Sequence, residues 1–115
     1  MSTNIESREA AESIRQACHS AYHVESIQEI YETIAEMRAA SNSLTTLLSV
    51  LEKRLLFIEK NGALSLDDTA AHDNVSAAVV SINTELNLAS RHASAMEDVL
   101  TLSHSTLSHI RQPLT

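Results

Sequence analysis

Two long stretches of the sequence repeat the same spacing, in which seam positions alternate between steps of three and four residues. This spacing brings one residue from each turn onto the same side of an α-helix and is typical of a coiled coil. The only glycine, Gly62, lies between the stretches. The sequence therefore predicts an all-α fold built on a long antiparallel helical hairpin. The seam positions are Ile27, Ile30, Ile34, Met37, Ser41, Leu44, Leu48, Leu51, Leu55 and Ile58, then Val75, Val79, Ile82, Leu86, Ala89, Ala93, Met96, Leu100, Ser103, Leu107 and Ile110.

The rest of the sequence agrees with a single helical domain spanning residues 1–115. One glycine and one proline are far fewer than usual, and no segment alternates apolar and polar residues as a strand would. The three aromatic residues leave a core of aliphatic side chains, as in helical bundles. We expect helices over approximately residues 3–19, 22–60 and 66–111, a turn over 61–65 and a C-terminal tail over 112–115.

Capping residues mark the expected helix ends. Ser26 with Glu29 has the spacing of a capping box, and Asn61-Gly62 suits a left-handed C-terminal cap. Ser65 with Asp68 can begin the last helix, and Pro113 can end it. Between Cys18 and Ser26 the apolar pattern shifts its phase, which favours a kink or short loop over one continuous helix.

The two seams predict a register for the hairpin, because antiparallel seams match alternate positions. The preferred register keeps the turn short; it places Ile30 opposite Leu100, Ser41 opposite Ala89 and Leu55 opposite Val75. A register one heptad longer also matches but needs a looser turn. In the preferred register no large side chain fills the Ser41 layer, so either the helices close in there or a third element fills the gap.

A second apolar line on each long helix predicts a further interface. The first helix, whose apolar side is thin, can cover only part of one hairpin. The remaining surface favours a homodimer in which two hairpins form a four-helix bundle. A monomeric three-helix bundle and higher or mixed oligomers are the alternatives. The predicted interface residues are Leu47, Val50, Phe57, Val80, Leu88, Val99 and Leu102.

Charge and composition argue against several partners and addresses. The net charge is −7, from fifteen acidic and eight basic residues, and the basic residues are scattered. Nucleic acids and anionic membranes are bound through clustered basic residues, so we expect neither as a partner. No apolar run approaches the length of a transmembrane helix, and the first residues do not resemble a signal peptide. With a single cysteine, Cys18, an internal disulfide is excluded, and we expect a cytoplasmic protein.

The histidines provide a candidate metal site at the open end of the hairpin. His19 and His23 are four residues apart, so a helix would place both rings on one face, and the preferred register brings His104 near them. The same cluster could loosen the open end as the pH falls. The simpler interpretation is solvated or capping histidines, because the Glu-x-x-His motif of di-iron bundles does not occur.

The sequence carries no motif for catalysis. It has no glycine-rich phosphate loop, nucleophile elbow or structural zinc spacing, so we expect neither an enzyme nor a bound cofactor. An acidic line, Glu25, Glu29, Glu32 and Glu36, is interpreted as a solvated face, with a basic partner as the alternative. The leading hypothesis is a protein–protein interaction module, such as an adaptor, small regulator or chaperone-like protein. A small-ligand or metal-sensing bundle and a purely structural protein are the alternatives.

Overall fold

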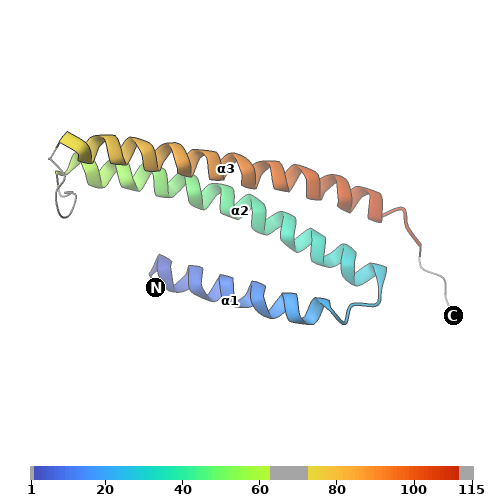
Figure 1. The fold of residues 1–115 in the computed structure, drawn as a ribbon. Coiled ribbons are helices and arrows are strands. Elements are labelled where there is room, and N and C mark those ends of the chain that lie inside the picture. The colour runs from blue at the N-terminus through green and yellow to red at the C-terminus, as the bar shows by residue number, and fades with distance from the viewer. Residues whose placement is uncertain (1, 63–72, 112–115) are drawn as a thin grey trace.

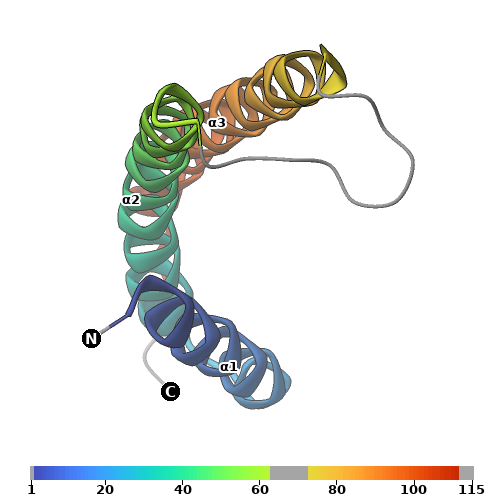
Figure 2. The same ribbon diagram turned by 90° about the vertical axis from the view of Figure 1, so that its left-hand side faces the viewer.

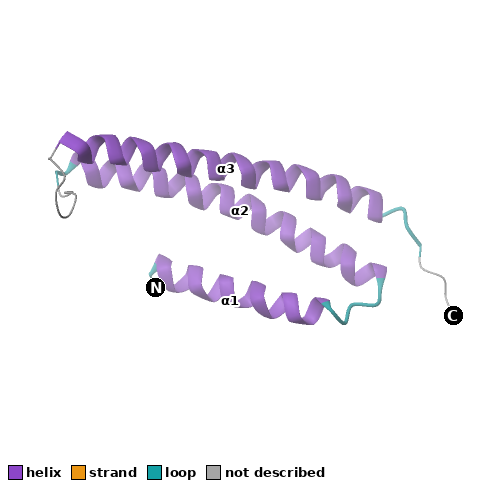
Figure 3. Cartoon of the chain, viewed as in Figure 1, coloured by secondary structure: helices purple, strands orange, loops and turns teal. Residues whose placement is uncertain are grey.

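Three helices make up the part of the chain that the computed structural model describes, residues 2–62 and 73–111. They are α1 (Thr3–Ala21), α2 (Ile27–Lys60) and α3 (Asp73–Leu107), and these described ranges contain no strand (Figures 1 and 3). α2 and α3 run antiparallel and pack against each other along their length. The molecule is long and narrow, with principal extents of 69 × 24 × 24 Å. The predicted all-α fold with a long helical hairpin is therefore confirmed.

A short loop separates α1 from α2, as the phase shift predicted. α1 extends to Ala21, two residues beyond the expected end, and α2 begins at Ile27 rather than at residue 22. Ser26 has an extended backbone, and its Oγ accepts a hydrogen bond from the Glu29 N–H at 3.0 Å. The cap stops the helix from growing backwards, because its hydroxyl satisfies an N–H group that lacks a helical partner.

Replacing Ser26 with alanine is expected to destabilise the hairpin by about 1 kcal/mol, because the cap hydrogen bond is lost. The unfolding midpoint in urea measures the change. Ser43→Ala, at an exposed position within α2, is the matched control and is expected to keep the midpoint or raise it slightly. Equal midpoints for both variants would show that the cap contributes nothing.

The far end of α2 also follows the predicted signal. Gly62 has a φ of 68°, a left-handed conformation that glycine adopts without strain, and its N–H donates to the Glu59 carbonyl at 3.0 Å. The expected cap at Ser65 and Asp68, and Pro113, lie outside the described residues. α3 ends at Leu107 rather than at residue 111. Just after this end, Ser108 Oγ donates a hydrogen bond to the Ser105 carbonyl at 2.6 Å. Such a serine contact competes with the backbone ladder.

Three rows of residues describe how α2 and α3 meet. The row that we name the shared row is buried or half-buried on both helices: Ile27, Ile34, Ser41, Leu48 and Leu55 on α2, and Val79, Leu86, Ala93, Leu100 and Leu107 on α3. The polar row, four residues further on, is also buried or half-buried: Tyr31, Arg38, Thr45, Glu52 and Glu59, with Asn83, Ser90, Glu97 and His104. The exposed row, three residues further on, holds Ile30, Met37, Leu44, Leu51 and Ile58, with Ile82 and Met96.

The predicted seam is therefore only half right. The shared row belongs to it and lies inside the hairpin, whereas the exposed row was expected inside and lies outside. Relative to whole turns, a step of four residues goes about 40° too far and a step of three falls about 60° short. The polar and exposed rows thus lie on opposite sides of the shared row. Both helices are rotated so that the polar row, not the exposed row, completes their contact.

The observed register also differs from the preferred one. Tyr31 stacks on His104, with ring centroids 4.0 Å apart, and Ser90 Oγ donates to the Thr45 carbonyl at 3.3 Å. The preferred register would place Tyr31 about one helical turn earlier on α3, beside Leu100. That register, with Ser41 opposite Ala89, is wrong, and the observed contacts fall between it and the longer alternative. The rotation of the helices causes this shift in register, because it places the shared row of α2 opposite the shared row of α3.

Small residues form the best-buried layer of the hairpin. Ser41, Ala93 and Ser90 are 1%, 5% and 8% exposed. The Ser41 hydroxyl donates to the Met37 carbonyl at 2.9 Å, so this buried polar group is satisfied. No third element covers the layer among the described residues, and the two helices themselves close over it, which was one of the two predicted outcomes.

α1 does not cover the hairpin. Every residue of α1 is exposed, and among the described residues it has no close backbone approach to α2 or α3. In both views α2 lies between α1 and α3 (Figures 1 and 2). The side-chain contacts shown within α1 are local, such as Arg15 donating to Glu12 and Ser7 Oγ donating to the Thr3 carbonyl at 2.9 Å. The expectation that α1 covers part of the hairpin is not met.

Candidate functional site

The exposed rows of α2 and α3 lie together on one face of the hairpin. The two helices are antiparallel, and their polar rows meet on one side of the contact, as the Tyr31–His104 and Thr45–Ser90 contacts show. The exposed rows must then lie together on the opposite side. The seven large side chains of this row are each 38% to 47% exposed. An ordinary protein surface exposes single, scattered apolar residues, whereas these seven side chains lie together on one face.

Most of the predicted interface residues are also exposed. Leu47 is half-buried; the other six are 45% to 69% exposed, with Leu102 at the upper limit. By heptad position, Leu47 and Val99 adjoin the exposed row, and Val50, Phe57, Leu88 and Leu102 lie further out on the same side. Val80 lies on the other side of α3. The role of these residues as an interface stays a prediction.

The polar row provides hydrogen-bonding groups inside the hairpin. Glu52 Oε1 and Asn83 Oδ1 are both buried without a hydrogen-bond partner among the described residues. Glu52 lies seven residues after Thr45, and Asn83 lies seven residues before Ser90. Because the helices are antiparallel, the Thr45–Ser90 contact implies that Glu52 and Asn83 lie opposite each other. A half-turn of the Asn83 amide presents its Nδ2 donor in place of the oxygen. This pair can therefore align the helices.

The histidines are not gathered as the metal hypothesis requires. His104 is half-buried against Tyr31, whereas His19, His23 and Cys18 are exposed. Across residues 2–62 and 73–111, no three histidine, cysteine, aspartate or glutamate side chains lie where they could hold a metal ion. The hypothesis therefore finds no assembled site in these ranges.

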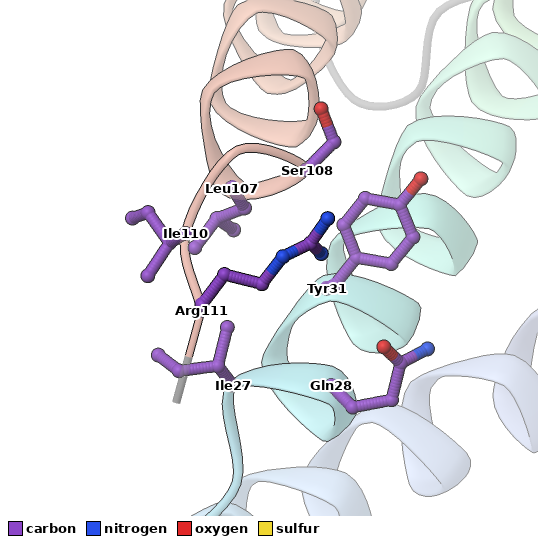
Figure 4. A pocket seen from close by; sticks show the side chains of 7 residues that line it. All are labelled: Ile27, Gln28, Tyr31, Leu107, Ser108, Ile110 and Arg111. Atoms are coloured by element: carbon purple, nitrogen blue, oxygen red, sulfur yellow. The ribbon is translucent and has the colours of Figure 1, made fainter. Parts of the chain in front are cut away.

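A shallow pocket lies at the open end of the hairpin, beside the Tyr31–His104 stack. It has a volume of about 140 Å³, and the Arg111 side chain extends toward the Tyr31 ring (Figure 4). The pocket is open to solvent. Its lining residues are Ile27, Gln28, Tyr31, Leu107, Ser108, Ile110 and Arg111.

None of the helices in the described ranges combines the length and the apolar character needed to cross a membrane. Comparison of the chain with protein-family models, with curated proteins and with solved structures finds no match. The apolar face formed by the exposed rows is therefore the candidate site on the strength of its geometry alone.

Proposed function

We propose that this chain is a non-enzymatic protein–protein interaction module that works as a homodimer, in which two α2–α3 hairpins form a four-helix bundle. The rotation of α2 and α3 carries this proposal. In a two-stranded coiled coil, both apolar rows of the heptad face the partner helix. In a four-helix bundle the two apolar rows of each helix face the common axis of the bundle. Each helix then contacts one neighbour on one side of these rows and a second neighbour on the other side.

The α2–α3 hairpin has the geometry of half such a bundle. Its shared and polar rows are used within the hairpin, and its exposed row is left for a second neighbour. Burying a large aliphatic side chain completely contributes about 1.5–3 kcal/mol. The seven residues of the exposed row thus supply a substantial part of the free energy that a dimer needs, and each copy contributes the same set.

The proposed role is that of an adaptor, small regulator or chaperone-like protein, which acts through its surface. A dimer would cover the exposed rows. The face of each hairpin opposite these rows, and the whole of α1, would stay free to bind other proteins. The ligand-sensing alternative has weaker support, because the pocket beside Tyr31 is shallow and the described residues contain no group of three side chains that could hold a metal ion.

Light scattering behind a sizing column, at several protein concentrations, tests the proposal. The chain has a mass of 12.6 kDa, and the expected result is a constant mass of twice that value. A mass that stays at 12.6 kDa at every concentration would overturn the dimer.

A further inference from the structure

The exposed row of α2 is suited to contact with a reversed copy of itself. It has a large aliphatic side chain at each of its five positions, and Leu44 lies at the middle both of the row and of α2, Ile27–Lys60. When two such helices run antiparallel, Leu44 meets the partner's Leu44. Ile30 then meets the partner's Ile58, and Met37 meets the partner's Leu51. Every layer along the helix is thus filled by two large apolar side chains.

The corresponding row of α3 is not continuous, and this favours like helices as neighbours. The large residues Ile82 and Met96 alternate with Ala89 and Ser103. A dimer that set α2 beside the partner's α3 would place some of the large α2 residues against these small ones. In the reversed arrangement, Ile82 of α3 meets the partner's Met96, and Ala89 meets the partner's Ala89. Large residues then face large ones, and small face small.

The charges on α2 select the same orientation. The exposed acids Glu29, Glu32 and Glu36 lie in its first third, and the exposed bases Lys53, Arg54 and Lys60 lie in its last third. Reversal about Leu44 brings Arg54, one heptad after Leu47 and therefore beside the exposed row, near the partner's Glu36. A parallel pair of α2 helices would place acids beside acids. Complementary charge of this kind fixes orientation in protein interfaces.

We propose that two copies of this chain join through α2, antiparallel about Leu44, with the α2–α3 turns at opposite ends of the bundle. This inference rests on the proposed homodimer and adds its orientation. The interface is isologous, since the same surface of α2 is used by both copies. The Arg54 guanidinium lies 4.4 Å from the Phe57 ring centroid. This contact holds the Arg54 side chain on the same side of α2 as Phe57.

Disulfide trapping tests the orientation directly. In a Cys18→Ser background, one copy carries Ile30→Cys and a second, size-tagged copy carries Ile58→Cys. After mixing and mild oxidation, a mixed disulfide dimer is expected on a non-reducing gel, and neither variant is expected to link efficiently alone. Leu44→Cys is expected to link with itself, and Thr46→Cys, exposed on the opposite side of α2, is the control that should not.

Other gel patterns would overturn the orientation without touching the dimer. If Ile30→Cys links with itself while the mixed product is missing, the two copies lie parallel, with both turns at one end. A doubled solution mass in the same samples would keep the homodimer and reject the orientation alone. A chain that is monomeric by light scattering would instead reject the proposed function and the orientation with it.

Charge exchange gives an independent test. Arg54→Glu is expected to raise the dimer dissociation constant about tenfold or more, because it places two acidic groups together at two symmetric positions. Adding Glu36→Arg to the same chain is expected to restore most of the affinity. Arg91→Glu, the same change at an exposed position of α3, is the matched control and should leave the affinity unchanged. A double variant no tighter than Arg54→Glu alone would contradict the orientation.

Discussion

Replacing Leu44 with glutamate is expected to reduce the solution mass of the chain from that of a dimer to that of a monomer. Leu44 lies at the centre of the exposed row and is 43% exposed in the single chain. The hairpin can therefore accommodate a charged side chain there. In the proposed bundle the two Leu44 residues meet, so the substitution would bury two carboxylates side by side. The cost of burying an unpaired charge amounts to several kcal/mol for each ion, which exceeds what one apolar layer contributes.

Light scattering measures the mass, and circular dichroism confirms that the helices persist. Thr46→Glu is the control, since Thr46 is exposed on the opposite side of α2. This control is expected to stay dimeric with unchanged helix content. A Leu44→Glu chain that remains a full dimer at micromolar concentration would show that the exposed row is not the contact surface.

Replacing Ser41 with leucine is expected to destabilise the hairpin by about 1–3 kcal/mol, because the new side chain overfills the small-residue layer. Ser41 is only 1% exposed and lies in the layer of Ala93 and Ser90. A leucine there must push α2 and α3 apart, which disturbs the packing of the shared row above and below. The unfolding midpoint in urea measures the loss.

Ser43→Leu is the matched control for this substitution, because it makes the same chemical change at an exposed position of α2. It is expected to change stability by less than about 0.5 kcal/mol. If Ser41→Leu proves as stable as this control, the two helices do not approach closely at this layer, and a larger space must exist between them.

The sequence predicted the helices well because their signals are local. The Ser26 cap and the left-handed Gly62 depend on side chains within one turn, and both are observed. The predicted end of α3, at residue 111, is too late, because the prediction rests on Pro113 as the residue that ends the helix. The helix in fact ends at Leu107, within a run of serine, threonine and histidine residues. Such residues favour the helix only weakly, and no single breaker marks the spot.

The rotation of the helices could not be predicted in the same way. A heptad repeat shows which positions are apolar, but it does not show which neighbour each position faces. Thr45 and Ser90 do not belong to the predicted seam, yet they lie inside the hairpin, whereas the seam residues Leu44 and Met96 lie outside. The candidate surface was missed for this reason. The polar row itself held the only signal, because small or hydrogen-bonding residues there permit the contact.

The isolation of α1 has a consequence for how this segment responds to its surroundings. A helix of nineteen residues that has no close backbone approach to α2 or α3 in the described part of the chain depends on its own backbone ladder and local side chains. Such helices are marginally stable in water, so we expect α1 to open and close independently of the hairpin. Its amide hydrogens then exchange with solvent long before those of α2 and α3. A partner surface that binds α1 must supply the free energy that keeps the helix folded. Slower amide hydrogen exchange in α1 would therefore report binding of such a partner directly.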